Sequence, residues 1–406
     1  MSARALLPDA PPDLAAYRKR GGYDTLAAAR QNVEGLRIAL GELDLTGLGG
    51  AHFSFARKLQ LALTTTGPRV VVCNAAEDEP GSRKDRTLLE RNPHVVLEGA
   101  LLAASALDAD VIYLYISEGL HEALEGVARA LAELDAASDL PAGVHIKIAK
   151  APTAYVAGEA SAVVSFLQGD EAKPRLQPPY PTESGVHGRP TLVSNCETLA
   201  NLPRRVAASR LAEGNPEHWT RLATVSGDVA HPTVVEIVPE LTTFADLIEL
   251  AGGLADTDTH LKAIQPGGPS SAYLDATAAG VHLTNAAIVA AGSQPGCLAV
   301  RVLASTRCMV EELVALTAFF AREQCGQCPP CRMKTQAYAA SLERLQRGAT
   351  DWTVLNQLAA VDEFVSDLPR RCALISMPSP PLTSAIALFR EDFSSHIDTK
   401  ACSILG

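Results

Sequence analysis

Three cysteines at identical spacing constrain this chain more than any other feature of its sequence. Residues 323–335 read EQCGQCPPCRMKT and place Cys325, Cys328 and Cys331 at two-residue gaps. A fourth thiol, Cys372, follows in PRRCALIS. Three consecutive thiols plus a distant one are a common way to bind the corners of an iron–sulfur cubane, whereas zinc ribbons usually present their cysteines in separate pairs. The spacing favours an iron–sulfur cluster, with zinc or unligated thiols as the alternatives.

The composition is that of an ordinary globular protein. The 406 residues are 47% hydrophobic and 20% charged, with a net charge of -11, which argues against a general nucleic-acid or membrane-surface role. No apolar run reaches the roughly 18 residues of a membrane-spanning helix, and the first twenty residues lack the apolar stretch of a signal peptide. Nine cysteines, an odd number and mostly scattered, argue against a disulfide framework. We therefore expect a cytoplasmic protein.

The first half of the chain alternates strand-like and helix-like segments. Short β-branched runs at residues 69–76, 110–117 and 144–150 are separated by HVVLEGALLAASAL and GLHEALEGVARALAEL, which have helical spacing. This pattern predicts an α/β domain with a largely parallel sheet. From about Thr224 the sequence pattern changes to that of a strand, a turn and a second strand, followed by one short helix that ends at Gly252 and Gly253. This pattern predicts a small α+β module.

After Thr306 the pattern is helical and predicts four amphipathic helices, typical of a bundle. Asp351 is the expected cap of the third helix, and the SMPSPPL segment is expected to break the chain before the fourth. The apolar faces are Val310, Leu313, Val314 and Phe320 in the first helix, Tyr338, Leu342 and Leu345 in the second, Val354, Leu355, Leu358 and Val361 in the third, and Ile386, Phe389 and Phe393 in the fourth.

Three polar or glycine-rich loops of the α/β region are candidates for a ligand site. TGLGGAHFSFARK, residues 46–58, suits a phosphate because glycines let backbone N–H groups approach it, although a purely structural turn is equally compatible. CNAAEDEPGSRKDR follows a buried strand, and AYVAGEASAVVSFL repeats that layout. Because ligands of α/β sheets bind at the carboxyl ends of the strands, the convergence of three such loops predicts one shared site.

The cysteines outside the cluster motif have simpler expected roles. Cys73, Cys297 and Cys308 lie in apolar surroundings and are expected to be buried, inert thiols. Cys402 lies near the end of the chain, where we expect it to be exposed.

These segments, in this order, resemble the NADH-binding flavoprotein subunit of respiratory complex I and its relatives in NAD-linked hydrogenases and formate dehydrogenases. The resemblance extends from about Gly47 to Ile397. Besides the loops above, it rests on DEPGSRKDRTLLERNPHVVLEGALLAA, PPYPTESGVHGRPTLVSNCETLANLP, QPGGPSS, CGQCPPCR and the closing RRCAL and FREDFSSHI.

The resemblance implies a fold and a function. It implies an α/β domain at residues 1–218 that binds FMN and nucleotide, a ubiquitin-like β-grasp module of the soluble-ligand-binding type at 219–304, and a four-helix bundle with a [4Fe–4S] cluster at 305–406. It implies hydride transfer from NADH or NADPH to FMN, after which single electrons leave through the cluster. The implied partners are a thioredoxin-like [2Fe–2S] subunit and a larger iron–sulfur subunit, in a hetero-oligomer.

The resemblance also assigns residues to the cofactors. The cluster ligands are Cys325, Cys328, Cys331 and Cys372. The cofactor-binding residues are Gly47, Gly49, Gly50 and Lys58 around the flavin phosphate, Phe53 as the aromatic that stacks on the nucleotide, and Asn74, Glu79, Tyr155, Gly158, Glu159, Tyr180, Asn195 and Thr198 in the remaining loops.

Departures from the family pattern fall on the ligand loops. An arginine is replaced by Leu48, a glycine by His52, an aspartate by Ala76, and the second glutamate of GEET by Ala160. Asp78 and Gln177 likewise replace a glycine and a lysine. Three functions remain open from the sequence: an NAD(P)H-oxidising electron-entry subunit, a flavin subunit that exchanges electrons with another carrier, and a flavin-free relay or scaffold that keeps the cluster.

Overall fold

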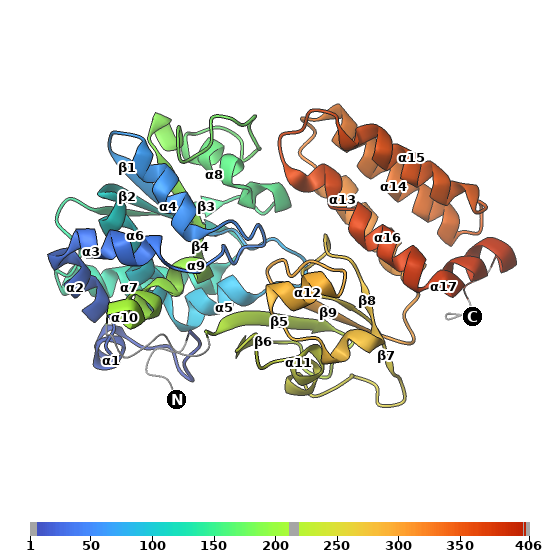
Figure 1. Cartoon of the computed structure of the whole chain (residues 1–406), viewed down its shortest axis with the longest axis horizontal. Helices are drawn as coiled ribbons and strands as arrows, with labels where there is room; N and C mark the ends of the chain where they lie inside the picture. Colours follow the sequence, from blue (N-terminus) through green and yellow to red (C-terminus); the bar gives the residue numbers. More distant parts are fainter. Residues whose placement is uncertain (1–5, 211–218, 401, 403–406) are drawn as a thin grey trace. The chain divides into compact units, whose positions relative to one another are not determined.

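The computed structural model describes residues 6–210, 219–400 and 402 and divides into two compact units (Figure 1). The first unit comprises the chain up to Asp78, Ser82–Ala223 and Val234–Val238. The second comprises Glu79–Gly81, Thr224–Thr233 and the chain from Pro239. The domain boundary predicted between residues 218 and 219 lies next to residues 211–218, which are outside the described residues. The outer limits predicted for the first and last domains, residues 1 and 406, are outside them as well.

A four-stranded parallel sheet organises the first unit. Its strands are β1 (Arg69–Ala75), β2 (Ala109–Ser117), β3 (His145–Ala151) and β4 (Thr191–Asn195), in the order β3-β2-β1-β4. The three strands expected from their β-branched runs are confirmed, as is the parallel sheet. The fourth strand is only five residues long and was not predicted, because its sequence TLVSN mixes polar and apolar residues.

Helices cover both faces of this sheet. They are α1 (Leu14–Lys19), α2 (Asp24–Gln31), α3 (Val33–Gly41), α4 (Phe55–Thr64), α5 (Lys84–Arg91), α6 (Pro93–Leu107), α7 (His121–Ala136), α8 (Ala160–Leu167), α9 (Cys196–Ala200) and α10 (Leu202–Arg210). One sheet face joins α6 in the larger core, through side chains such as Ile112 and Leu114. The other face, with Val72 and Tyr115, packs against Val164 of α8. This alternation follows from the period of two in a strand.

A second, mixed sheet follows in the chain. It consists of β5 (Arg221–Gly227), β6 (Thr233–Ile237), β7 (Leu261–Gln265), β8 (Leu274–Asp275) and β9 (Ala299–Ala304), in the order β6-β5-β9-β7-β8. Strands β5 and β9 are parallel, whereas β7 is antiparallel to β9 and β8. The predicted short helix is α11 (Phe244–Leu250), followed by Gly252 and Gly253 with φ of 83° and 81°. A further short helix, α12 (Asn285–Ala290), precedes β9.

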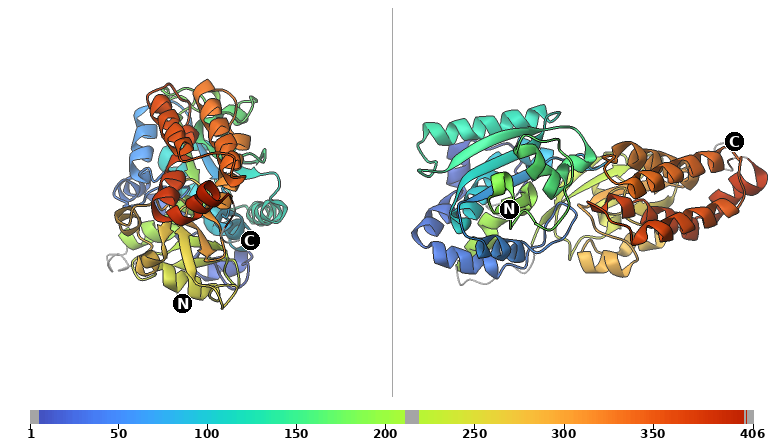
Figure 2. Two further views of the ribbon diagram at one scale, coloured as in Figure 1. Left: turned by 90° about the vertical axis from the view of Figure 1, so that its right-hand side faces the viewer. Right: turned by 90° about the horizontal axis from the view of Figure 1, so that it is seen from above.

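The C-terminal part of the second unit is helical, as predicted. It contains α13 (Met309–Glu323), α14 (Pro329–Gln346), α15 (Thr353–Ser366), α16 (Ser379–Leu388), α17 (Arg390–Ser394) and a π turn at Ser395–Thr399. Helices α13, α14 and α15 lie side by side (Figure 2), and most of the predicted apolar residues form or border one core. Phe320 of α13 is the exception, because it is buried but does not belong to that core.

The prediction of a single fourth helix after SMPSPPL is wrong in two respects. Pro380 and Pro381 do not break the chain but lie in the first turn of α16, where a proline loses no hydrogen bond because the first N–H groups have no helical partner. The helix then ends at Leu388, so Phe393 belongs to α17. The Asp351 carboxylate accepts the N–H of Thr353 at 2.9 Å, although Trp352 occupies the N-cap position itself.

Within the described residues, every helix is too short or too polar to span a membrane.

Candidate functional site

The strand order of the first unit creates a switch point between β1 and β4. From β1 the chain crosses to β2 and β3 on one side, and β4 is added on the other. Ligands of open α/β sheets bind at such a point, beside the carboxyl ends of the strands. Asn74 and Asn195 are register partners at those ends. The Asn74 side chain donates to the carbonyl of Gly158 at 2.8 Å, which brings the third predicted loop to the same place.

The glycine-rich loop closes over this switch point. Its backbone is tied back on itself, because the N–H of Gly47 donates to the carbonyl of Phe53 at 2.9 Å. The N–H of Leu48 donates to the Thr198 hydroxyl at 2.9 Å. A Cβ added to Gly49 would lie 3.1 Å from the Asn195 Cβ, so only glycine fits there without displacing a neighbour. The structure therefore brings Gly47, Gly49, Thr198 and Asn195 together, as predicted.

Lys58 extends from α4 toward β4. Its ammonium donates to the carbonyl of Val193 at 2.9 Å, and burial lowers its pKa to about 8. The helix begins immediately after the glycine loop, with Ser54 as its N-cap. A cation at this position suits an anionic group placed near the loop, which would replace the interaction with water that burial removes.

A buried charge network beneath the switch point was not predicted. The Lys84 ammonium lies 2.5 Å from Asp85 Oδ1 and 3.1 Å from Glu197 Oε2, and all three side chains are buried. Asn195 joins them by donating to Asp85 Oδ2 at 2.6 Å. Burial raises the pKa of Asp85, and the Lys84 charge opposes that rise. Charged residues usually lie on the surface, so nothing in SRKDR or NCETL indicated this network.

Two predicted residues make contacts of another kind. The Glu159 carboxylate caps α8 by accepting the N–H groups of Ser161 at 2.9 Å and Ala162 at 3.1 Å. Glu79 belongs to the second unit, where a Cβ on Gly268 would lie 2.2 Å from its Oε1. The Glu159 contacts stabilise the start of α8, and Glu79 approaches the backbone of Gly268 closely. The cofactor role of both carboxylates stays a prediction.

The predicted aromatic residues differ in how they are held. Tyr155 begins the 3-10 turn Tyr155–Gly158, next to the carbonyl that Asn74 binds. Phe53 is 46% exposed and Tyr180 is 51% exposed. Exposed rings are available for stacking on a planar ligand.

The residues that depart from the family pattern are accommodated within their loops in different ways. Leu48 is 6% exposed and packs in the core, so its side chain does not face a ligand. His52 has a φ of 50°, a left-handed conformation that suits the glycine it replaces. Asp78 accepts a hydrogen bond from Ser117 at 3.1 Å. A Cβ on Gly158 would lie 3.2 Å from the Ala76 carbonyl oxygen, so the third loop approaches the second as closely as glycine allows.

The four predicted cluster cysteines converge in the second unit. Cys325 lies in the connection between α13 and α14, Cys328 is the N-cap of α14, and Cys331 lies in its first turn. Cys372 follows α15 and precedes the 3-10 turn Ala373–Ser376, which contacts α14. Burial raises the pKa of the Cys331 thiol to about 12, with smaller contributions from Cys372, Cys328 and Cys325. The three other thiols are thus close enough to Cys331 to repel its charged form.

The spacing of these sulfur atoms suits a cluster better than a single ion. All four cysteines are among the described residues, and no three of their sulfur atoms lie within 4.8 Å of one another. A tetrahedral zinc ion with Zn–S bonds of about 2.3 Å would hold its sulfur ligands roughly 3.8 Å apart. A cubane binds one cysteine at each iron corner and therefore needs wider spacing. The thiol set fits an iron–sulfur cluster.

Lys334 is a further charged residue at this site that sequence reasoning missed. It is 1% exposed, and its ammonium donates to the Ser379 hydroxyl at 2.6 Å and pairs with Asp362. Its charge lowers the pKa of Cys331 against the effect of burial. Of the arginines near these cysteines in the sequence, Arg332 and Arg370 are exposed and Arg371 is half-buried.

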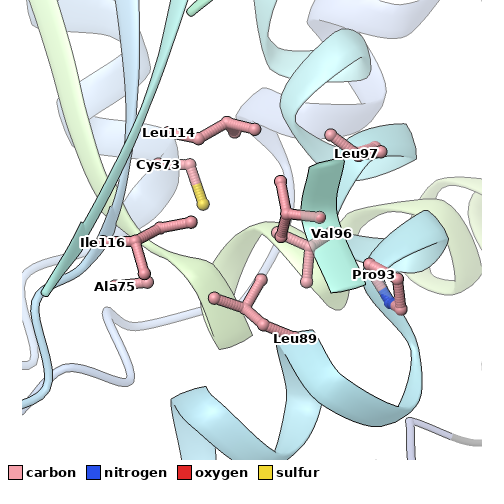
Figure 3. Close-up of a pocket in the computed structure, with 9 residues that line it drawn as sticks. Cys73, Ala75, Leu89, Pro93, Val96, Leu97, Leu114 and Ile116 are labelled. Carbon is pink, nitrogen blue, oxygen red and sulfur yellow. The ribbon is translucent and has the colours of Figure 1, made fainter. Parts of the chain in front are cut away.

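Cys73, Cys297 and Cys308 are buried, as predicted. The surroundings of Cys308 are not purely apolar, however, because its sulfur lies 3.3 Å from His396 Nε2. Figure 3 shows the Cys73 sulfur facing apolar side chains that include Val96 and Leu89. Burial raises the pKa of this thiol, so it stays protonated and unreactive. Cys402 is partly buried against the C-terminal core instead of fully exposed.

Three family models match along the chain. Residues 40–204 match the Nuo51 FMN-binding domain, residues 222–272 match the SLBB domain, and residues 311–396 match the NADH-ubiquinone oxidoreductase-F iron-sulfur binding region. The chain is 31% identical over 403 residues to the second NADH-quinone oxidoreductase F subunit of Rhizobium meliloti, covering 96% of this chain and 95% of that protein. The chain belongs to the family of NADH-quinone oxidoreductase F subunits.

Other similar proteins support this family assignment. The NADH-quinone oxidoreductase F subunit of Escherichia coli is 33% identical over 94% of this chain and 89% of its own length. The structure also matches a chain in the crystal structure of an NAD+-reducing [NiFe]-hydrogenase in the H2-reduced state, with a TM-score of 0.82 and 32% identity. That match covers 93% of this chain and 65% of the hydrogenase chain.

Family membership confirms the predicted resemblance. It also confirms the electron-entry function in its general form: the chain is an oxidoreductase subunit of the NADH dehydrogenase type, with an FMN-binding α/β domain, an SLBB domain and a [4Fe–4S] region. The alternative of a flavin-free or donor-altered relay is not favoured.

Proposed function

We propose that the switch point between β1 and β4 binds FMN, that NADH reduces it there, and that the four cysteines of the second unit hold the [4Fe–4S] cluster that receives the electrons. The observation that carries this proposal is the convergence of the glycine loop, Asn74 and Asn195 at one sheet edge. FMN, when bound, accepts two electrons as a hydride and releases them one at a time, which suits a one-electron acceptor such as an iron–sulfur cluster.

The phosphate of FMN belongs in the glycine loop. The N–H groups of Gly47 and Leu48 hold the loop in place, so the backbone of Gly49 and Gly50 supplies the donors, and Lys58 supplies a cation that is already desolvated. Gly49 keeps the loop close to Asn195, so a larger residue there would push the loop off the site. Asn74, Asn195 and Thr198 then hold the polar part of the flavin, and Phe53 provides an exposed ring for stacking.

The altered side chains are compatible with a working site. Leu48 contributes its backbone N–H to Thr198 and buries its side chain, so the loop keeps its position without the arginine of relatives. His52 has a φ of 50°, a backbone conformation that glycine adopts readily. What these replacements change is the surface that meets the nucleotide, where Ala160 lacks a carboxylate able to bond a ribose hydroxyl. We therefore expect NADH to bind more weakly than in relatives, with NADPH as the second donor to test.

The finer domain and partner assignments are also proposals. The mixed sheet with α11 supports a β-grasp module, and α13 to α16 around one core support a four-helix bundle. One cluster motif in the chain means that electrons must pass to another protein, for which a thioredoxin-like [2Fe–2S] subunit and a larger iron–sulfur subunit of a cytoplasmic hetero-oligomer are suited.

The test is an anaerobic visible titration of the purified protein. Bound flavin is assayed after acid release, and NADH and NADPH are then added in separate samples. We expect bound FMN whose band near ~450 nm bleaches with NADH. Protein that carries iron but releases no flavin, or flavin that neither nucleotide bleaches, would refute the proposal.

A matched pair of variants tests the site itself. Gly49→Ala places its Cβ 3.1 Å from Asn195 and is expected to weaken FMN binding about 10- to 100-fold, which corresponds to the roughly 1–3 kcal/mol of an overpacking substitution. Gly41→Ala is the control, because its Cβ would meet only the end of Gln60 at 4.0 Å. Equal FMN affinity in both variants would place the flavin elsewhere.

A further inference from the structure

A second cluster of metal-binding side chains lies apart from the four cluster cysteines in the helical part of the chain. The ligand atoms of Cys308, His396 and Cys402 all lie within 4.8 Å of one another. They come from three different segments: Cys308 precedes α13, His396 lies in the π turn, and Cys402 follows that turn. Cys308 and His396 are each 3% exposed. Three soft or borderline donors therefore meet, two of them buried and the third, Cys402, half-buried.

The histidine is oriented as a metal ligand would be. Its Nδ1 lies 2.9 Å from the carbonyl oxygen of Gln346, which can only accept, so Nδ1 carries the proton. Its Nε2 faces the Cys308 sulfur at 3.3 Å. Metal-binding histidines almost always donate their second ring N–H to a carbonyl or carboxylate, which fixes the tautomer and turns the other nitrogen to the metal. The Gln346 carbonyl is such a partner for the Nδ1–H of His396.

The surroundings favour a cation shared by the three groups. Two thiolates and one neutral imidazole would balance a divalent ion, so the complex could stay buried without a net charge. Among the described residues, no three of Cys325, Cys328, Cys331 and Cys372 meet as closely as these three groups do.

We propose that Cys308, His396 and Cys402 bind one zinc ion, with water in the fourth position, and that the ion fastens the C-terminal segment to the start of α13. Zinc takes cysteine and histidine ligands in tetrahedral geometry, and three protein ligands of this kind with an open position are an established arrangement. The site is independent of the proposed flavin and cluster chemistry, and its role is to anchor the end of the chain.

Metal analysis of the purified holoprotein tests the proposal through two variants with opposite effects. Wild-type protein should contain about one zinc per chain besides its cluster iron, measured on the same sample. Cys402→Ser should lose most of the zinc and keep its iron, since one of three protein ligands is removed. Cys331→Ser should lose iron and keep zinc. Cys297→Ser, a buried cysteine outside both groups, should keep both.

X-ray absorption at the zinc edge provides the second readout. We expect two sulfur ligands at about 2.3 Å and one nitrogen at about 2.0–2.1 Å in wild-type protein and in Cys331→Ser. Iron-loaded protein without zinc would overturn the proposal. Zinc that disappears with Cys331→Ser but survives Cys402→Ser would place the ion at the cluster cysteines. A Cys308–Cys402 disulfide in the unreduced protein would overturn it as well.

Discussion

The proposed flavin site and the proposed iron–sulfur site of this chain differ in the groups that form them. The flavin site in the first unit is formed mainly by backbone groups of loops, held in place by Asn74, Asn195 and Thr198. The cluster site in the second unit is formed by four cysteine side chains on loops and helix ends. A site made of backbone tolerates side-chain replacement, whereas a site made of thiols does not. This difference explains why the replaced residues Leu48, His52 and Ala76 fall on the flavin loops, while every cluster cysteine is present.

The largest effect should follow from removing one thiol. Cys331 is the most buried of the four and lies in the first turn of α14. Cys331→Ser should lose nearly all of the about four irons per chain, because serine is a poor ligand for soft iron. Flavin content should stay at the wild-type level, because the glycine loop, Lys58, Asn74 and Asn195 belong to the other unit. Iron and flavin assays on one preparation measure both. Loss of flavin together with iron would break the proposed independence of the sites.

The buried lysines of the two units provide the next comparison. Lys84→Met should lower the free energy of unfolding by about 3–5 kcal/mol, because it leaves Asp85 and Glu197 buried without their cation. Lys334→Met should lower it by only about 1 kcal/mol, because the Asp362 side chain is 42% exposed and water can solvate it. Urea denaturation of the two variants measures the difference. If both variants lost the same free energy of unfolding, the burial of the carboxylate partners would not explain the cost of removing the lysine.

The charge of Lys58 should make flavin binding depend on pH. Its pKa is lowered to about 8 by burial, so in flavin-free protein the cation is lost as the pH rises through that value. Binding of FMN should weaken above about pH 8, and Lys58→Arg should remove this dependence because arginine stays charged. Titration of apoprotein with FMN from about pH 7 to about pH 10 measures it. A flat profile in wild-type protein would exclude Lys58 as the phosphate partner.

The lowered pKa of Lys58 also makes the free energy of unfolding of flavin-free protein depend on pH. Between about pH 8 and its ordinary pKa of 10.5, the unfolded chain holds a proton on Lys58 that the folded chain has released. The free energy of unfolding should therefore rise with pH in this window through this group. In Lys58→Arg that contribution should vanish.

The smallest effect concerns His52. Because its φ is 50°, His52→Gly should relieve strain and raise the free energy of unfolding by up to about 1 kcal/mol. Its iron content should not change. Thermal unfolding of the variant beside wild type gives the measurement. A clear loss of stability would mean that the imidazole contributes more through its contacts than its backbone conformation costs.

Much of the fold and of the cluster site could be predicted because their signals are local. The β-branched runs of β1, β2 and β3 and the helical spacing of α6 and α7 persist over many residues. The cluster cysteines are recognisable by spacing alone, since three of them lie within one loop and one helical turn. The glycine loop was predicted through its motif, and its closeness to Asn195 agrees with that prediction.

The parts that could not be predicted depend on contacts between distant residues. The pairing of Lys84 with Glu197 joins residues more than a hundred positions apart, and lysine and glutamate carry no sign of burial in their sequence. Lys334 is another case. The start of α16 was missed for a different reason, because prolines end a helix in its interior but fit its first turn.

The most direct test of the account is whether NADH reduces the cluster through bound flavin. Anaerobic protein is mixed with NADH, and the electron paramagnetic resonance signal of the reduced [4Fe–4S] cluster is recorded for wild type, Gly49→Ala and Cys331→Ser. We predict a cluster signal in wild type, a signal in Gly49→Ala reduced in proportion to its lost flavin, and bleached flavin without a cluster signal in Cys331→Ser. A cluster that NADH reduces equally well in flavin-depleted Gly49→Ala would contradict the account.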